Sequence, residues 1–550
     1  MNLQKPKVTK QGNDPLDNIT FKILGDFGKW QLKISILMAL LKLPMAWYQL
    51  NILFLAPPQN FWCAKPNICS RYSEEEWRDI CSPRNQEHPC LIFDPDILAV
   101  APLIDRSLVP LVHCKQFVYD TSIFSRTITS EWNLVCSEHW LIHFTQAVMM
   151  WGTVVGGILF PMWGDKYGRK NPLMFGILLQ FVAGFLTCIV RQYWIFMIFW
   201  FILAVATGGL GIISFVVCME VVGGKWRTII PVFYQLPFGL GNTVLALLAY
   251  WIRDWRYLEF ALACLTSLFV LYYFAMEESP RWLLATGQLE KACVVLETAA
   301  RFNGRENEFK NAKRTLLKVG TKNIHNPGFF AFIKSRNMRT KTLLLSVNWF
   351  CTGLAFFTFS QYLGYIATNL YLMIFLSGLI ALPGCMLCLF IIMRYGRKTT
   401  VWIFQIITST CFLTILIIPK EMYANDWPRL IVAGVGFASL SGTVPALYLY
   451  SGELFPTLGR NAGVGGVTTF ARIASMIAPG VVSLDEVIAD LPLIILAVMS
   501  FCQLALLVPL PETKDHPLPD TLEEAEHFSK LVCIEENENH GKEKKTAGNA

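Results

Sequence analysis

Long apolar blocks separated by polar segments fill most of the chain. The blocks are about 20 residues long, the length that a helix needs to cross the roughly 30 Å hydrocarbon core of a bilayer. Because a backbone surrounded by lipid must satisfy its own hydrogen bonds, each block is predicted to be a helix. The twelve predicted spans are residues 32–55, 141–162, 172–190, 194–219, 228–251, 257–276, 342–365, 368–393, 399–418, 428–450, 461–482 and 490–510.

A polar stretch at 278–340 separates the first six spans from the last six. We therefore predict an all-α membrane protein of two pseudo-symmetric six-helix bundles, with one large loop between the first two helices. The charged tail is predicted to be disordered, because it is too polar to bury a core. The predicted divisions are an N-terminal segment at 1–31, a first bundle at 32–276 containing the large loop at 57–140, a connecting loop at 277–341, a second bundle at 342–510 and a tail at 511–550.

Lysine and arginine gather in the N-terminal segment, in the stretch at 278–340 and in two short loops that carry the sequence YGRK. The segments that alternate with them are less basic, and SLDEVIAD at 483–490 is acidic. Since cytoplasmic loops of membrane proteins are enriched in Lys and Arg, both termini are predicted to be cytoplasmic and the large loop extracellular. We identify no signal peptide ahead of the first span.

Composition supports the membrane class and argues against other classes. Hydrophobic residues make up 54% of the chain and charged residues only 16%, whereas soluble domains carry about 25% charged residues. The net charge of +7 is explained by the cytoplasmic loops, so we assign no nucleic-acid partner. We find neither a phosphate-binding loop nor zinc-ligand spacing, so the sequence indicates no enzyme, no ATP-driven pump, no cofactor and no metal site.

The large loop holds six of the sixteen cysteines. An even number of cysteines on the oxidising side of a membrane predicts disulfides, here up to three, and the sequence does not determine their pairing. The alternative is that all six are free thiols. The six residues are Cys63, Cys69, Cys81, Cys90, Cys114 and Cys136.

Three short features occur once in each half, in the same order. Their offsets of 228, 233 and 234 residues are nearly equal, which indicates an internal duplication. The features are YGRK at 167–170 and 395–398, an acid seven residues before an arginine at Glu220 and Arg227 and at Glu453 and Arg460, and an acid after the last span of each half at Glu278 and Glu512.

Every repeated feature falls on the predicted cytoplasmic side. Acids and bases at neighbouring helix ends can form an ionic cluster, and one cluster in each half suits a gate that closes when the two bundles meet. The alternative is that the basic residues only fix the topology, which leaves the regularly spaced acids unexplained. The predicted gate residues are Asp165, Arg169, Glu220, Arg227, Glu278, Arg281, Arg397, Glu453, Arg460 and Glu512.

From about residue 20 to residue 515, the chain resembles the organic cation, anion and zwitterion (carnitine-type) transporter family of the major facilitator superfamily. This resemblance implies a plasma-membrane transporter that works by alternating access, with its substrate site near the midplane between the halves. The ordered motifs that carry it are GDFGKWQ at 25–31, the cysteine-rich loop, EWNLVCSEHW at 131–140, AYWIRDWRYL at 249–258, ESPRWL at 278–283 and GELFPTLGRNAG at 452–463.

Two cationic residues inside predicted spans suggest the substrate class, because charges within a bilayer are costly and rarely lack a function. Arg472 lies midway along the eleventh span, where the family's anion and zwitterion transporters tend to have Arg and its cation transporters an acid. Its guanidinium could bind a carboxylate bidentately. Lys42 lies near the middle of the first span, and the alternative is a lysine capped by backbone or water without any ligand role.

No Asp or Glu lies in the middle of a predicted span, and Glu259 is near the outer end of the sixth. A simple organic cation therefore lacks a counter-charge, and proton symport lacks its titrating group, which leaves uniport or exchange as the simpler mechanism. Aromatic residues at matched motif positions complete the predicted substrate site, although each could instead face lipid or the core. They are Phe238, Trp349, Phe356, Phe357 and Tyr448.

The sequence thus predicts a transporter of small organic anions or zwitterions. One alternative is an organic cation transporter. Another is a receptor on the same fold that transports nothing, because Trp200 replaces an arginine usual in the fourth helix of the family. The predicted partners are the substrate and the lipid bilayer, and the oligomeric state is not determined.

Overall fold

The computed structural model describes residues 20, 23–65, 73, 77, 90–100, 109–318, 329–366, 369–419, 422, 426–456, 460–486, 488, 490–514, 522 and 525–526. Among these residues, eleven helical segments are long and apolar enough to cross a membrane. A shorter apolar helix of 17 residues, Leu491–Leu507, follows them. Together they give the twelve predicted spans in two groups of six.

The first half contains six spans. They are α2, α3 and α4 (Lys29–Leu40, Lys42–Leu50 and Ile52–Leu55), α8 (Trp140–Tyr167), α9 (Lys170–Ile189), α10 (Tyr193–Val221), α11 and α12 (Trp226–Phe233 and Leu236–Trp251), and α13, η4 and α14 (Trp255–Ser267, Leu268–Leu271 and Tyr272–Ala275). The second half contains the other six. They are α19 (Arg336–Ile366), α20 (Leu370–Tyr395), α21 (Arg397–Ile417), α22 (Trp427–Leu454), α23 (Arg460–Val482) and α24 (Leu491–Leu507).

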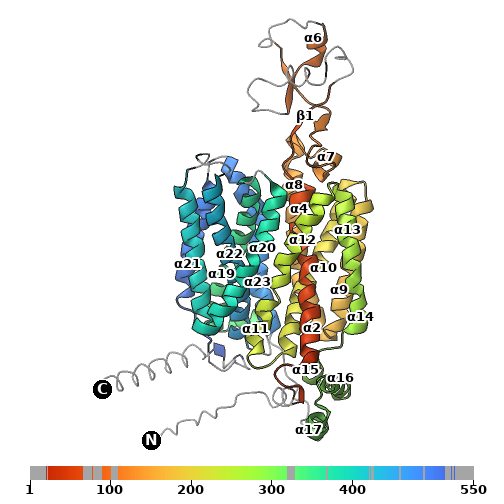
Figure 1. Cartoon of the computed structure of the whole chain (residues 1–550), viewed down its shortest axis with the longest axis vertical. Helices are drawn as coiled ribbons and strands as arrows, with labels where there is room; N and C mark the ends of the chain where they lie inside the picture. The colour runs from red at the N-terminus through yellow and green to blue at the C-terminus, as the bar shows by residue number, and fades with distance from the viewer. Residues whose placement is uncertain are drawn as a thin grey trace, which may run out of the picture.

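The two halves lie side by side with their helices upright in Figure 1. Two helix pairs join them, because α8 packs on α23 and α12 packs on α20. Small residues bring backbones together inside the first half: a Cβ at Gly156 would collide with Val205 of α10, and one at Gly208 would collide with Thr153 of α8. Close packing through glycine is the usual way for membrane helices to associate.

Two spans of the first half are interrupted. The first span breaks at Leu41 and again at Asn51, and Pro44 lies just after the first break. The fifth span breaks between α11 and α12 at Tyr234 and Gln235, with Pro231 before the break and a second proline after it. Because proline removes a backbone donor and clashes with the preceding turn, it favours such breaks.

The large loop projects from one end of the bundle (Figure 1). An all-α fold was predicted, but this loop contains two antiparallel strand pairs. The first pair is β1 (Phe61–Cys63) with β4 (Phe117–Tyr119), and the second is β2 (Leu91–Phe93) with β3 (Leu111–His113). Two short helices, α6 (Pro95–Val100) and α7 (Ile128–Trp132), accompany them, and the 3-10 turn η3 (Cys136–Glu138) leads into α8. We call this end of the molecule the disulfide end.

Two disulfides lie in this loop, Cys63–Cys114 and Cys90–Cys136. They account for four of the six cysteines that were predicted to pair. Cys69 and Cys81 lie outside the described residues. The predicted tail at 511–550 also lies mostly outside them.

The opposite end, which we call the YGRK end, carries both YGRK loops and four helices of the polar stretch. These helices are α15 (Pro280–Ala285), α16 (Leu289–Phe302), α17 (Glu306–Lys318) and α18 (Phe329–Lys334). Asn303, just after α16, accepts a hydrogen bond from Trp30 N at 2.9 Å and donates one to Gln31 Oε1 at 2.8 Å. The end of α16 is thereby attached to the start of α2, directly below it in Figure 1.

Candidate functional site

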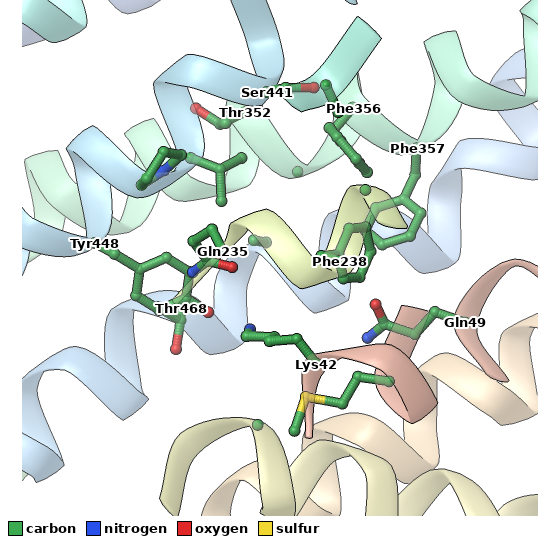
Figure 2. A pocket seen from close by; sticks show the side chains of 18 of the residues that line it. Lys42, Gln49, Gln235, Phe238, Thr352, Phe356, Phe357, Ser441, Tyr448 and Thr468 are labelled. Carbon is green, nitrogen blue, oxygen red and sulfur yellow. The ribbon is translucent and has the colours of Figure 1, made fainter. Parts of the chain in front are cut away.

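A cavity of about 150 Å³ lies between the two halves. A cavity of roughly this volume can hold a ligand the size of benzene, so the space suits a small organic ion. Side chains from α3, α8, α10 and α12 line one side of the cavity, and side chains from α19, α20, α22 and α23 line the other. Figure 2 shows how ten of these residues point into it.

All seven residues predicted for the substrate site line this cavity. They are Lys42, Phe238, Trp349, Phe356, Phe357, Tyr448 and Arg472. They come from five different spans, so only the folded arrangement of the two halves brings them together.

Arg472 on α23 reaches across the cavity to the other half. Its Nη1 donates to the backbone carbonyl of Thr153 on α8 and, at 3.4 Å, to that of Gly208 on α10. The approach needs Gly157, because a Cβ there would lie only 2.7 Å from Nη1. The guanidinium lines the cavity, and its acceptors are these two backbone carbonyls and the hydroxyl of Tyr448 rather than a carboxylate.

Lys42 begins α3, directly after the break in the first span. Its Nζ lies 4.7 Å from the ring centroid of Tyr234 and 5.9 Å from that of Tyr448. Aromatic faces attract an ammonium group through the ring quadrupole. The aromatic contacts replace part of the hydration that the ammonium loses on burial, and they leave its charge without a counter-ion.

No carboxylate lines the cavity among the described residues, whereas two cationic side chains do. Coulomb attraction is strong where little water screens it, so an anionic group is the natural complement of this space. The net positive lining is the main electrostatic property of the site.

Uncharged polar side chains also line the cavity, and they were not predicted from the sequence. Three buried atoms, Gln235 Nε2, Asn242 Oδ1 and Ser441 Oγ, have no hydrogen-bond partner among the described residues. Gln235 lies in the break between α11 and α12, and broken helices of transporters often line their binding sites. The two prolines around this break were the sequence signal for Gln235. The other uncharged polar lining residues are Gln49, Thr207, Thr352 and Thr468.

Aromatic contacts between the halves flank the cavity at both ends. Toward the YGRK end, Phe215 of α10 lies 5.1 Å from Tyr448 of α22, measured between ring centroids. Toward the disulfide end, Tyr371 of α20 packs against Phe54 at 5.6 Å and Tyr250 at 5.7 Å. Movement of one half against the other must break one of these groups of contacts.

An ionic network occupies the YGRK end of the first half. Arg169 binds Asp165 at 2.5 Å and Glu220 at 3.1 Å, and its backbone N donates to Glu278 at 2.7 Å. Ser279 Oγ donates to the second oxygen of Glu220 at 2.6 Å. Burial alone would lower the pKa of the Arg169 guanidinium, but the carboxylates of Glu220 and Asp165 outweigh burial and raise that pKa.

The second half repeats this network. Arg397 binds Glu453 at 2.9 Å, and its backbone N donates to Glu512 at 2.9 Å. Thr513 takes the place of Ser279 and donates to Glu453 at 2.6 Å. The duplication inferred from sequence is thus a duplication of geometry as well.

The glycine of each YGRK loop explains part of this repeat. Gly168 has a φ of 101° and Gly396 has a φ of 105°, values that residues with a side chain rarely adopt. A Cβ on Gly396 would also lie 2.7 Å from Glu512 Oε2. Glycine therefore lets the carboxylate reach the backbone N–H group of the residue that follows.

Arg169 and Arg397 each pair with acids of their own half. The prediction placed one ionic cluster in each half and had the gate open when the bundles part, and this opening stays a prediction. Arg397 does make a contact between halves, because its Nη2 donates to Thr228 of α11 at 3.1 Å. Of the remaining predicted residues, Arg227 donates to the carbonyl of Val222, Arg281 lies on α15, and Arg460 begins α23.

Comparisons with known proteins agree with the fold. The family model for the sugar (and other) transporter matches residues 112–524. The "Organic cation transporter protein" of Drosophila melanogaster is 30% identical over 538 residues, covering 96% of this chain and 97% of the relative. Solute carrier family 22 member 3 of Rattus norvegicus is 30% identical over 527 residues, covering 91% and 94%.

Solved structures show the same fold at low sequence identity. The proton:xylose symporter XylE bound to 6-bromo-6-deoxy-D-glucose is 15% identical with a TM-score of 0.60, covering 91% of this chain and 99% of that one. The human organic anion transporter MFSD10 is 13% identical with a TM-score of 0.53, covering 87% and 99%. On the family model and the 30% identical relatives, this chain belongs to the organic cation transporter-like family, solute carrier family 22, of the major facilitator superfamily.

Proposed function

We propose that this protein carries small organic anions or zwitterions across the plasma membrane by alternating access, as a uniporter or an exchanger. The observation that supports this substrate class is the cavity between the halves, which Arg472 and Lys42 line without any carboxylate among the described residues. The disulfide end would face outside, and the YGRK end and both termini would face the cytoplasm.

Arg472 would link substrate binding to movement of the halves. Without substrate, its guanidinium on α23 bonds backbone carbonyls of α8 and α10 in the opposite half. A substrate carboxylate is a stronger acceptor than a neutral carbonyl and can engage the planar guanidinium with two bonds. Binding would therefore weaken a direct contact between the halves while the substrate fills the space between them.

The ionic networks would keep each half rigid during this movement. Because their ion pairs connect helix ends within one half, the two halves could separate at the YGRK end without breaking them. One polar contact that would break there is the bond from Arg397 to Thr228. In this proposal the predicted gate residues contribute to gating indirectly, because they hold the helix ends of each half in place.

Uptake by oocytes that express the full chain tests the substrate class. The panel contains para-aminohippurate as an anion, carnitine as a zwitterion and tetraethylammonium as a cation. We expect uptake of the anion or the zwitterion, and we expect Arg472→Ala to weaken its apparent affinity by roughly 10- to 100-fold, because a hydrogen bond to a charged group contributes about 1.5–3 kcal/mol.

Two further variants sharpen the result. Arg472→Lys keeps the charge but loses the paired N–H donors of the planar guanidinium. The affinity of this variant for the substrate should therefore fall between those of the wild type and Arg472→Ala. Arg301→Ala removes an exposed arginine of α16 and should change nothing. All rates are divided by the amount of protein at the cell surface. Unchanged affinity and rate in Arg472→Ala would remove Arg472 from the site.

The rival function is organic cation transport. The relatives named above as organic cation transporters favour it, and the aromatic lining could bind an organic cation through its ring faces. Uptake of tetraethylammonium without uptake of the anion or the zwitterion would establish this rival. Uptake of none of the three by protein present at the surface would favour a receptor.

A further inference from the structure

A buried carboxyl group outside the cavity has no assigned role. Glu259 on α13 is 0% exposed, and so is Asn51, the residue between α3 and α4. Asn51 Nδ2 donates to Glu259 Oε1. The sequence placed Glu259 near the end of its helix but gave no sign of this burial.

Each of the two groups has one oxygen that is not satisfied. Glu259 Oε2 and Asn51 Oδ1 are both buried without a hydrogen-bond partner among the described residues. Leaving a buried polar atom unpaired is costly, and leaving a buried carboxylate without a cation costs more. The pair therefore lacks one donor and one unit of positive charge.

The neighbouring titratable groups do not supply that charge. From α3 comes the phenol of Tyr48, which is bonded to Thr266, and from α9 comes the thiol of Cys188. On α13 itself the groups are Cys264 and Arg256. The Arg256 guanidinium is engaged by Glu131 at 2.5 Å and by the backbone carbonyls of Cys188 and Val190 at the end of α9.

A single proton completes both groups at once. On Oε2 it gives Glu259 a donor for Asn51 Oδ1, and a carboxylic acid and a carboxamide can then bind each other through two hydrogen bonds. A metal ion would need more ligands, and no group of three or more His, Cys, Asp or Glu residues that could hold one occurs among the described residues. We propose that Glu259, paired with Asn51, is a proton-binding site that is occupied in the arrangement seen here.

The position of the pair connects it to the contacts between the halves. Asn51 is the first residue before α4, and α4 carries Phe54, which stacks on Tyr371 of the second half at 5.6 Å and 17°. Opening at the disulfide end must separate Phe54 from Tyr371. Because the first span is broken at Asn51, α4 can shift when it loses this contact although the rest of its half stays rigid, and this shift would pull Asn51 from Glu259 and admit water.

The loss of this proton on opening determines how pH affects the two arrangements. With Asn51 withdrawn and water present, the carboxyl group releases its proton to the solvent at the disulfide end, and closing requires that a proton be taken up again. Glu259 does not line the cavity, so the proton opposes opening without being carried across. Acid should therefore favour the arrangement that is closed at this end. This link rests on the alternating-access function proposed above, whereas proton binding itself does not.

Infrared spectroscopy of the purified full chain in lipid tests the site without any substrate. At neutral pH we expect the carbonyl stretch of a protonated carboxyl group, shifted in D₂O. Glu259→Gln should remove this band. Asn51→Leu should move it to higher frequency, because the hydrogen bonds are lost. Glu297→Gln, which removes an exposed carboxyl group of α16, is the matched control and should leave the band unchanged.

Several results would overturn the proposal. Absence of the band from the wild type at neutral pH would do so without any variant, and so would a band that persists in Glu259→Gln. A band that disappears when choline chloride is replaced by sodium chloride would assign the site to sodium instead. For the link to opening, Tyr371→Ala should lower the band at neutral pH and restore it in acid. If the band of Tyr371→Ala shows the same pH dependence as that of the wild type, the link to opening is refuted, whereas the proposed transport function is not affected.

Discussion

Gly396 of the second YGRK loop offers a direct test of the repeated network. We expect Gly396→Ala to destabilise the second half, because two costs add. The backbone has a φ of 105° and a ψ of 177°, a region that is essentially restricted to glycine and costs other residues about 1–3 kcal/mol. The new Cβ would also lie 2.7 Å from Glu512 Oε2 and push the carboxylate from its donors.

The second cost can be bounded from the contacts of Glu512. Its carboxylate accepts from the backbone N of Arg397 at 2.9 Å and from that of Thr399 at 3.4 Å. Losing the shorter bond, which involves a charged group, costs about 1.5–3 kcal/mol. The sum is about 2.5–6 kcal/mol. For a unit of 150–250 residues each kcal/mol lowers the melting temperature by about 2–4 °C, so we expect a decrease of at least about 5 °C.

The assay is thermal unfolding of the purified full chain in detergent, followed by the loss of the monodisperse peak on gel filtration at a fixed heating rate. Gly452→Ala is the matched control, because Gly452 lies within α22 and a Cβ there meets nothing within 4 Å. Alanine is a better helix former than glycine, so this variant should be as stable as the wild type or slightly more so. Equal melting temperatures for the two variants would refute the reasoning.

Two further predictions concern the network and the large loop. Thr513→Val removes the hydroxyl that donates to the buried Glu453 carboxylate and should cost about 1.5–3 kcal/mol in the same thermal assay, whereas Thr286→Val, at the exposed residue just after α15, should cost little. Loss of the Cys63–Cys114 disulfide in Cys63→Ser should cost about 2–5 kcal/mol of loop stability, measured as faster proteolysis of the intact chain; cleavage at the wild-type rate would contradict this.

Much of the fold could be predicted from the sequence because its two strongest signals are long-range. The length of an apolar block is fixed by the thickness of the bilayer, so the spans were placed to within a few residues. The repeated YGRK sequence alone indicates that Arg169 and Arg397 occupy equivalent positions in the two halves. The positions of Lys42 and Arg472 on the cavity followed from the cost of charge in lipid together with the family resemblance.

The rest depended on which groups meet in space. Two of the acceptors of Arg472 are backbone carbonyls, which every residue has, so no sequence motif identifies them. One ionic cluster in each half was predicted, but the sequence did not show which acid each arginine contacts. Glu259 is buried because its side chain turns toward Asn51, more than 200 positions away in the sequence. Apolar periodicity does not resolve such a pairing.

The pairing of Arg169 and Arg397 with acids of their own halves bears on the energy of the proposed transport cycle. Opposite charges at low exposure are expensive to pull apart, and a carrier that separated them at each turn would face a high barrier. In the proposed cycle these pairs would stay within their own bundle. The contacts exchanged at each turn would include ring stacking and single hydrogen bonds to neutral oxygens, so the barrier to turnover could stay low while each bundle remains stiff.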